Sequence, residues 1–238
     1  MMEKSTRPVR VAENVSVEQF REEIFPGNEP VLLKGLIADW PAVREGLTSP
    51  DAMVRYIRRF DQGKPVDTIL GKPEIEGMFF YNEKMDGLNF AKKSMSIGRS
   101  MERILALRGQ EKPPSIYIQS TPIHEFLPGF LAENPMNLAS EPASPRIWIG
   151  NKLTVQTHFD LKENIACVVS GRRRFTLFPP DQLRNLYVGP IDLTPAGQSI
   201  SLVDFHEPDF ERFPRFREAL EHAQVAEMEP GDALFIPS

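Results

Sequence analysis

The sequence has almost no cysteine, and it lacks both long apolar runs and an excess of positive charge. Its 238 residues include a single cysteine, Cys167, which excludes an intramolecular disulfide. The polar start Met-Met-Glu-Lys-Ser-Thr-Arg has no apolar core of the kind that a secretory signal needs. No apolar run approaches the length that spans a membrane. We therefore expect a soluble protein of a reducing compartment, the cytoplasm.

The charge balance bears on the class of partner. The net charge is −5 and the isoelectric point is near 5.5. A protein that tracks phosphate backbones needs a broad basic surface, so the sequence does not favour a nucleic-acid partner, although it leaves room for a local basic pocket.

The size and composition favour a single domain. Hydrophobic residues make up 41% of the chain, which is enough for one sizeable core. The 22 prolines and 15 glycines are spread along the chain, as expected for many short elements joined by turns. No linker or internal repeat is evident. We expect one domain over residues 1–238, with a mixed α/β part at 1–114 and a β core at 115–238.

The N-terminal part combines helix and strand patterns. Ser16 and Gln19 form a capping-box pattern, and Ser49-Pro50 is typical of a helix start. The patterns predict helices at 16–25, from 49 onward and at 96–107, and strands at 30–36 and 78–81.

From Ser115 onward the patterns are mainly those of strands. Short apolar or alternating runs occur at 115–119, 146–150, 153–160, 164–170 and 173–178. A helix is predicted at 210–223, followed by a hairpin over 224–236 with a type II turn at Pro230-Gly231. The predicted fold class is mainly β with helical N-terminal decorations, a jelly roll. Trp148, Phe175, Phe178 and Cys167 are expected in its core.

The main candidates for metal ligands are in the tripeptide His158-Phe159-Asp160. These residues lie in Thr154–Asp160, which alternates like a strand, so the imidazole and the carboxylate are expected on one face. Two imidazoles and one carboxylate form the ligand set of non-haem Fe(II) oxygenases. By itself the pair is a weak signal, because it also arises by chance or as a surface hydrogen bond. Its place in a predicted jelly roll makes metal binding the better hypothesis.

Several motifs in order resemble a known family. They are His158-Phe-Asp, Asn164, Gly171-Arg-Arg-Arg-Phe-Thr-Leu-Phe-Pro-Pro-Asp-Gln, Ser201-Leu-Val-Asp-Phe, Pro208-Asp-Phe-Glu-Arg-Phe-Pro and Glu229-Pro-Gly-Asp-Ala-Leu-Phe-Ile-Pro. Together they resemble the cupin-like Jumonji-C hydroxylases, and most of all the asparaginyl hydroxylase that inhibits hypoxia-inducible factor. The resemblance covers residues 115–238, and a looser similarity includes residues 30–36 and Asp39-Trp-Pro.

The resemblance implies a double-stranded β-helix that binds Fe(II), with 2-oxoglutarate and O2 as co-substrates. His158 and Asp160 match the first two metal ligands. The third family ligand is a histidine a few residues beyond the Ile-Pro of the last motif, so we expect the chain to be truncated before its last strand. The chain has three other histidines that could replace this third ligand. His206 is the best candidate of the three, whereas His124 and His222 are expected at the surface.

The distal carboxylate of 2-oxoglutarate needs a cation, for which a guanidinium offers a bidentate fork. By position in the resemblance, Arg173 takes this role where the similar hydroxylase has a lysine, and Arg172 and Arg174 are expected in solvent. Tyr117 matches a tyrosine that binds the same carboxylate, and Asn164 matches an asparagine near the co-substrate. The family has a threonine three residues before the first histidine ligand, and this chain has Val155 at that position. Thr154 lies on the same face as His158 if the strand is regular, so we expect it to take the place of the threonine.

The first functional hypothesis is an Fe(II)- and 2-oxoglutarate-dependent hydroxylase whose unidentified substrate is a protein side chain. A second hypothesis is a cupin-like binding module that lacks the distal histidine and has no activity. A third, weaker hypothesis is a cupin isomerase with another divalent metal. Relatives dimerise through C-terminal helices, so we expect a homodimer only if such a segment exists.

These expectations make a first prediction. A jelly roll without its last strand exposes unpaired backbone groups on a neighbouring strand. Residues 1–238 expressed alone should therefore be poorly soluble and bind Fe(II) weakly. Gel filtration and anaerobic Fe(II) titration test this, and a monomer with micromolar affinity or better would contradict it. The gene sequence beyond Ser238 should encode a histidine within a few residues.

Overall fold

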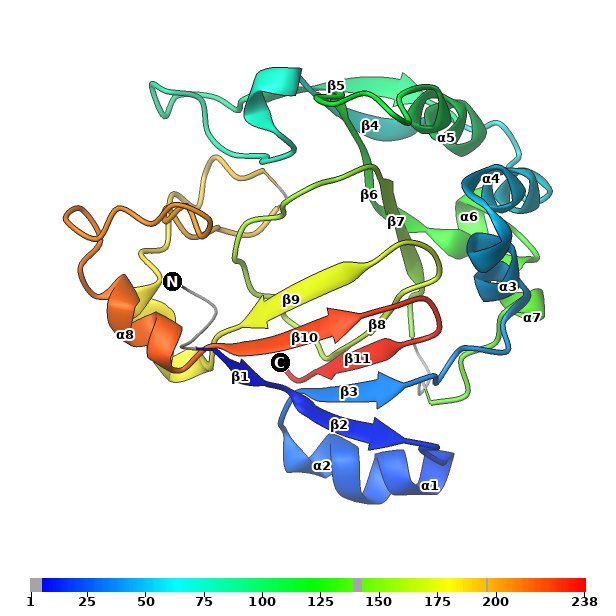
Figure 1. Cartoon of the computed structure of the whole chain (residues 1–238), viewed down its shortest axis with the longest axis horizontal. Coiled ribbons are helices and arrows are strands. Elements are labelled where there is room, and N and C mark those ends of the chain that lie inside the picture. Colours follow the sequence, from blue (N-terminus) through cyan, green and yellow to red (C-terminus); the bar gives the residue numbers. More distant parts are fainter. Residues whose placement is uncertain (1–5, 139–142, 196) are drawn as a thin grey trace. The chain divides into compact units, whose positions relative to one another are not determined.

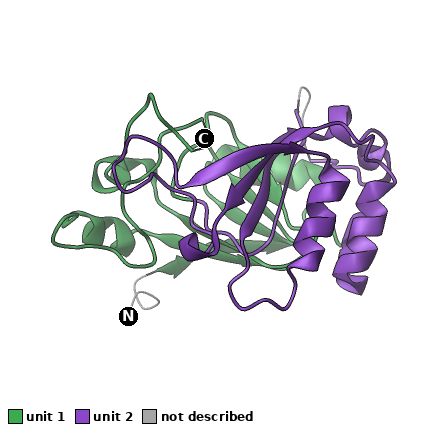
Figure 2. Ribbon diagram, turned by 90° about the horizontal axis from the view of Figure 1, so that it is seen from above, with its two compact units in different colours: residues 1–38, 156–238 green, residues 39–155 purple. Residues whose placement is uncertain are grey.

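The computed structural model describes residues 6–138, 143–195 and 197–238. The chain divides into two compact units, which Figure 2 shows in different colours. Unit 1 contains residues 1–38 and 156–238, and unit 2 contains residues 39–155. The expected single domain, with a division at residue 114, stays a prediction.

Unit 1 is built on two β-sheets, whose strands are labelled in Figure 1. One sheet has the order β1-β10-β9, and the other has the order β2-β3-β11-β8. The strands are β1 (Arg7–Pro8), β2 (Arg10–Glu13), β3 (Val31–Lys34), β8 (Asn164–Cys167), β9 (Arg173–Leu177), β10 (Gln224–Met228) and β11 (Ala233–Ile236). The helical segments are α1 (Val17–Gln19), η2 (Phe20–Ile24), α2 (Phe25–Gly27), η4 (Pro180–Asn185) and α8 (Phe216–Glu221).

An apolar cluster with members from both sheets forms one core of unit 1. Ala226 and Met228 of β10 pack with Leu32 of β3 and Leu234 of β11, all of them buried. Alternate residues of a strand share a face, so each sheet presents one apolar face to this cluster. Two pairs of consecutive strands, β8 with β9 and β10 with β11, are divided between the two sheets. This mainly β arrangement is consistent with the jelly roll expected from the sequence.

The helical segment after Ser16 packs on β11. Ser16 accepts a hydrogen bond from the Gln19 backbone N–H, so the predicted helix start is confirmed. The Gln19 side chain instead contacts Glu23, so the reciprocal half of the capping box is not formed. The Phe20 ring lies 5.4 Å from that of Phe235, and Figure 1 shows α1 and α2 beside β2 and β3.

The last two strands do not form the predicted hairpin. β10 pairs with β9 and β1, whereas β11 pairs with β3 and β8. The predicted turn itself is present, because Asp232 N–H donates to the Glu229 carbonyl and Gly231 has a φ of +102°. The turn therefore carries the chain from one sheet to the other, which sequence periodicity cannot distinguish from a hairpin.

A buried carboxylate anchors this turn. Asp232 is only 3% exposed, and it accepts hydrogen bonds from Lys34 Nζ at 2.7 Å, Glu229 N at 2.9 Å and Gly35 N at 3.1 Å. Burial by itself raises the pKa of Asp232, but the Lys34 hydrogen bond and the two backbone donors outweigh it, so the pKa is lowered. The carboxylate thus ties the turn before β11 to the end of β3.

The predicted helix at 210–223 is shorter than expected. α8 begins only at Phe216, since the segment before it forms turns and contains Pro214, which cannot donate a backbone hydrogen bond. Its buried face joins a second apolar cluster, in which Phe216, Ala219 and Leu220 pack with Leu186 and Val203.

Unit 2 contains one antiparallel sheet with the order β5-β4-β6-β7. Its strands are β4 (Val66–Gly71), β5 (Phe90–Met95), β6 (Ser115–Pro122) and β7 (Arg146–Gly150). Its helical segments are α3 (Pro41–Thr48), α4 (Pro50–Arg58), η3 (Pro73–Ile75), α5 (Ile97–Ala106), α6 (Ile123–Phe126) and α7 (Phe130–Glu133). Ser49 and Ser96 each accept a backbone hydrogen bond at a helix start, as their positions predict.

A buried amide links three helices of unit 2. Asn134 is fully buried, and its Oδ1 accepts from the Ala42 N–H at the start of α3. Its Nδ2 donates to the Tyr56 hydroxyl of α4 and to the Phe130 carbonyl of α7. All hydrogen-bonding groups of this carboxamide are engaged.

Three other sequence predictions are wrong. Residues 78–81 form isolated bridges, Met78 with Thr154 and Tyr81 with Leu88, and no strand. Residues 153–160 also form only isolated bridges, so the regular strand expected there does not exist. Trp148 is 44% exposed, because its neighbours Ile147 and Ile149 occupy the other face of β7.

Within residues 6–138, 143–195 and 197–238, every helix is too short or too polar to cross a lipid bilayer.

Replacing Asp232 by Asn should destabilise unit 1 in a pH-dependent way. The lowered pKa means that the carboxylate contributes stability above its unfolded pKa of about 3.9 and loses it as pH falls through the lower folded value. The variant should lose about 2 kcal/mol at pH 7 and show a flatter profile below about pH 4. Urea unfolding at several pH values measures this, and parallel profiles for both proteins would contradict it.

Replacing Asn134 by Leu should destabilise unit 2. The change leaves the buried Ala42 N–H, the Tyr56 hydroxyl and the Phe130 carbonyl without this partner, which should cost about 3 kcal/mol. Thermal unfolding measures the loss. Asn137→Leu, at an exposed position nearby, is the matched control, and equal effects of both changes would show that the buried network is not the cause.

Candidate metal and co-substrate site

The segment that carries His158 is extended but is not part of a regular strand. His158 forms an isolated antiparallel bridge with Ile200, and the Thr157 carbonyl accepts from Ser201 N–H at 2.8 Å. These contacts hold the segment within unit 1. They come from a partner about 40 residues further along the chain, which local patterning could not have identified.

The His158 imidazole is oriented by the backbone. Its Nδ1 lies 2.8 Å from the Gln156 carbonyl oxygen. A carbonyl oxygen can only accept, so Nδ1 carries a proton, and in the neutral form of the ring the lone pair is on Nε2. A ring N–H held by a backbone carbonyl is the arrangement typical of metal-bound histidines. Nε2 of His158 is therefore the ring nitrogen that could bind a metal ion.

The Asp160 carboxylate is held at both oxygens. Asn164 Nδ2 donates to Oδ2 at 3.1 Å, and Gln198 Nε2 donates to Oδ1 at 3.0 Å. Asn164, at the start of β8, also donates to the Lys162 carbonyl. From the sequence, Asn164 was expected near the co-substrate. The structure shows that it also holds the Asp160 carboxylate. Gln198 was not anticipated, because it lies 38 residues from Asp160 in the sequence.

The donor set of His158 and Asp160 fits Fe(II), which accepts imidazole nitrogen and carboxylate oxygen. In the part of the chain that the structure describes, no group of three or more His, Cys, Asp and Glu side chains could hold a metal ion. His124, His206 and His222 are all exposed, as expected for surface residues. None of them joins His158 and Asp160 in such a group.

A buried amide next to the site fits an oxygen-rich ligand. Gln156 is 4% exposed, and its Nε2 has no hydrogen-bond partner among the described residues. Buried amide donors in proteins are nearly always paired. The chemistry of this donor suits a carboxylate or carbonyl oxygen, both of which 2-oxoglutarate carries. The residue precedes His158 by two positions.

The three arginines of 172–174 lie in different environments. Arg172 and Arg174 form ion pairs with Glu229 and Glu227 at 3.2 and 3.3 Å, so their expected place at the surface is confirmed. Arg173 is also exposed, and its guanidinium lies 4.5 Å from the centre of the Phe175 ring.

Arg173 and Arg174 project from opposite faces of β9. Arg173 and Phe175 alternate along β9, so they share a face, and Phe175 packs against the apolar cluster of unit 1. Arg173 is thus on the cluster side of its sheet, while Arg174 is on the other. The predicted contact of Arg173 with 2-oxoglutarate stays a prediction.

Tyr117 and Thr154 belong to unit 2. Tyr117, on β6, is buried and stacks on Phe79 with the ring centres 5.8 Å apart. Thr154 is half-buried, and its backbone N–H donates to the Gly77 carbonyl at 2.9 Å. Their predicted roles in co-substrate binding stay predictions.

Cys167 is a poor candidate for chemistry. Burial raises the pKa of its thiol to about 12, so the thiol stays protonated at neutral pH. It is half-buried on β8 and behaves as a small hydrophobic residue, as the sequence suggests.

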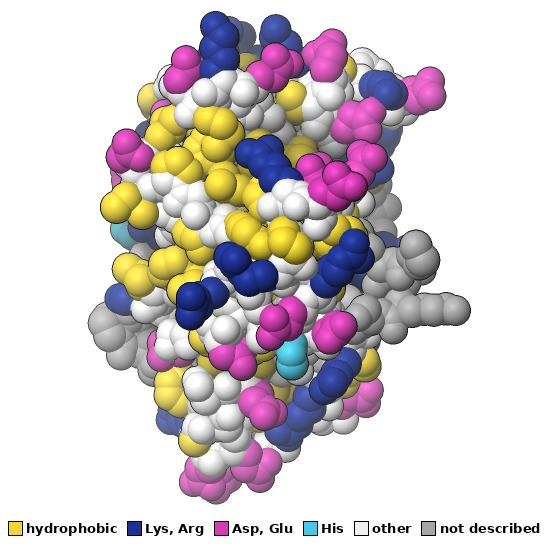
Figure 3. Space-filling model, turned by 90° about the vertical axis from the view of Figure 1, so that its left-hand side faces the viewer, with side chains coloured by type: hydrophobic (Ala, Val, Ile, Leu, Met, Phe, Trp, Pro, Cys, Tyr) yellow, Lys and Arg dark blue, Asp and Glu magenta, His cyan; other side chains and the backbone are white. Residues whose placement is uncertain are grey.

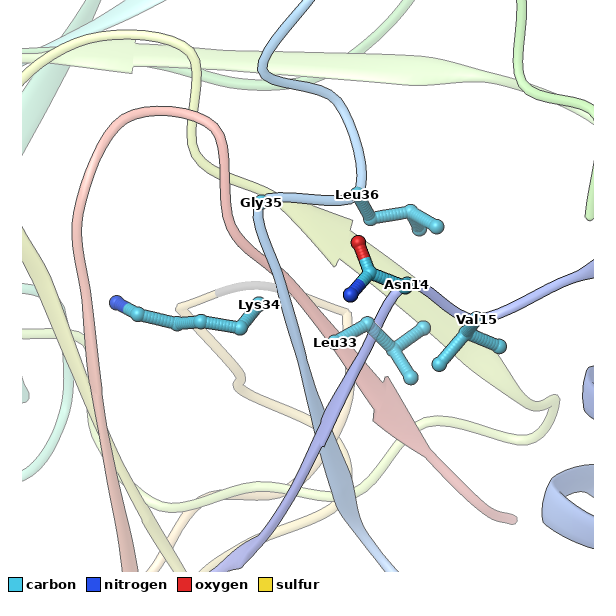
Figure 4. Close-up of a pocket in the computed structure, with 6 residues that line it drawn as sticks. All are labelled: Asn14, Val15, Leu33, Lys34, Gly35 and Leu36. Carbon is cyan, nitrogen blue, oxygen red and sulfur yellow. The ribbon is translucent and has the colours of Figure 1, made fainter.

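A small pocket of about 130 Å³ lies elsewhere in unit 1 and is shown in Figure 4. It is lined by Asn14, Val15, Leu33, Lys34, Gly35 and Leu36. Figure 4 shows that the Lys34 side chain extends away from the other labelled side chains, which agrees with its hydrogen bond to Asp232. None of the predicted site residues is among the residues that line it.

Two exposed apolar side chains flank Asp160. Phe159 is 51% exposed and Leu161 is 83% exposed, on either side of Asp160. On the face of the molecule drawn in Figure 3, acidic and basic side chains are interspersed with hydrophobic ones. No single sign of charge dominates that face.

Comparison with known proteins gives relatives that contain this type of domain. A segment of 110 residues is 36% identical to JmjC domain-containing protein F of Dictyostelium discoideum, covering 41% of the chain and 23% of that protein. A segment of 100 residues is 32% identical to lysine-specific demethylase JMJ31 of Arabidopsis thaliana, covering 42% of the chain and 18% of that protein.

A further relative, which is among several of that kind, matches over the whole chain. The tRNA wybutosine-synthesizing protein 5 of Mus musculus is 23% identical over 255 residues, covering 100% of the chain and 73% of that protein. The first two relatives are much longer than this chain. The match spans about a fifth of the length of each of them.

Residues 17–238 match the family described as Cupin-like domain. This match covers almost the entire chain and agrees with the mainly β fold and with the JmjC relatives. The chain therefore belongs to the cupin-like domain family, with relatives that carry JmjC domains.

Proposed function

We propose that the protein is an Fe(II)- and 2-oxoglutarate-dependent oxygenase that hydroxylates its substrate. Cupin-like JmjC proteins are typically oxygenases of this kind, and the relatives include a lysine-specific demethylase by name. The observation that carries the proposal is the oriented ligand pair. His158 presents Nε2 because Gln156 holds Nδ1, and amide donors hold Asp160 at both oxygens.

In this proposal the chain's residues bind and orient the reactants. His158 and Asp160 hold the metal, and the bound Fe(II) with 2-oxoglutarate and O2 supplies the oxidation of a substrate C–H bond. Arg173 provides the cation for the distal carboxylate of 2-oxoglutarate, and Gln156 provides an amide donor for one of its oxygens. Asn164, Tyr117 and Thr154 complete the proposed set of co-substrate residues.

We propose a protein side chain as the substrate. The exposed apolar residues Phe159 and Leu161 flank Asp160, and such surfaces suit a peptide better than a phosphate backbone. The net charge of −5 and the mixed charge on the face in Figure 3 point the same way. Closeness to the asparaginyl hydroxylase is part of this proposal. The match of the whole chain to 73% of the tRNA wybutosine-synthesizing protein 5 makes tRNA the alternative to test.

The metal site is tested by adding Fe(II) and 2-oxoglutarate to the full-length protein without oxygen. A visible charge-transfer band should appear, and His158→Ala and Asp160→Ala should abolish it. His222→Ala, an exposed histidine at the end of α8, is the matched control and should keep the band. A folded protein without the band would support the binding-module hypothesis instead.

Substrate class is tested by coupled turnover. Peptides should increase the conversion of 2-oxoglutarate to succinate, and tRNA should not. Arg173→Met should raise the KM for 2-oxoglutarate by about tenfold, because one charge-assisted contact is lost. Stimulation by tRNA alone would reject the protein substrate, and an unchanged KM would reject the role of Arg173. Turnover without consumption of 2-oxoglutarate would indicate an isomerase.

A further inference from the structure

Asp160 and Gln198 are opposite each other because of a specific backbone register. His158 bridges Ile200 in an antiparallel sense, and Thr157 is hydrogen-bonded to Ser201. In an antiparallel pair, two steps forward on one segment correspond to two steps back on the other. Asp160 therefore faces Gln198, and their side chains meet at 3.0 Å.

The contact matters because Asp160 lies in an exposed segment outside any regular strand. An aspartate in such a place samples several rotamers, and fixing one of them costs conformational entropy at the moment of ligand binding. Gln198, which is half-buried, holds Oδ1, while Asn164 holds Oδ2. Each oxygen keeps a further lone pair that can bind a metal ion.

We infer that Gln198 is a positioning residue that fixes the Asp160 carboxylate for metal binding. The inference rests on the proposed function, in which Asp160 is a metal ligand. Gln198 belongs to the segment that bridges His158, so one stretch of chain aligns the backbone of the first ligand and the side chain of the second. Asn164 acts on the other oxygen from the start of β8.

The test compares two equal substitutions in the full-length protein. Gln198→Met removes the amide donor at nearly constant length. Gln224→Met makes the same change at another half-buried glutamine of unit 1, on β10, where its neighbours in the sheet are Arg7 and Leu177. Anaerobic titration with Fe(II), and with Mn(II) as a redox-stable probe, gives the dissociation constant. Thermal unfolding of each protein is measured in parallel.

Gln198→Met should weaken metal binding by about tenfold, the lower end of the range for outer-shell partners of metal ligands. Gln224→Met should leave the affinity unchanged, and both variants should unfold near the wild-type temperature. Excess Fe(II) should restore kcat in Gln198→Met with an unchanged KM for 2-oxoglutarate, which a general structural defect would not produce. Gln198→Ala also removes the amide donor but adds no apolar side chain, and it should weaken metal binding to a similar extent.

The outcomes separate this inference from the proposed function. A wild-type protein that binds no Fe(II) or Mn(II) overturns both. If the wild type binds and Gln198→Met binds equally well, only the positioning role of Gln198 is rejected. An equal loss of affinity in Gln198→Met and Gln224→Met also rejects it, because the loss would not depend on contact with Asp160.

Discussion

The hydrogen bonds of the buried Asp232 carboxylate are the constraint on which unit 1 depends. Lys34 and the backbone of Gly35 and Glu229 all donate to it, so the end of β3 and the start of β11 are fixed against each other. A buried carboxylate without such donors would be strongly unfavourable. The register of β11 between β3 and β8 follows from this anchor.

The candidate site is connected to that anchor through β8. Asn164, the first residue of β8, pairs with Ile236 of β11, and its side chain reaches Asp160. The position of the carboxylate that we propose as a metal ligand thus depends on a sheet register set at the other end of β11. The second support, from Gln198, comes through the bridge between His158 and Ile200. Asp160 is held from two directions by segments distant in sequence.

Sequence alone predicted the features that depend on local chemistry. The helix start at Ser49-Pro50, the helix at 96–107 and the turn at Pro230-Gly231 follow from capping, apolar periodicity and φ restriction. The order of motifs indicated the family. Features set by non-local pairing were missed: β10 and β11 lie in different sheets, and the alternating segment at 153–160 is no regular strand. Gln198 was missed for the same reason, since its role exists only through a partner 38 residues away.

The order of segments along the chain also has a consequence for synthesis. Strands β1, β2 and β3 are made before unit 2, but β1 pairs with β10 and β3 pairs with β11, which leave the ribosome much later. The intervening unit 2 is continuous in sequence, so its sheet and helices can form while the chain is still growing. The partners of β1 and β3 are made only after about 200 further residues, and such a large sequence separation between paired strands favours slow folding.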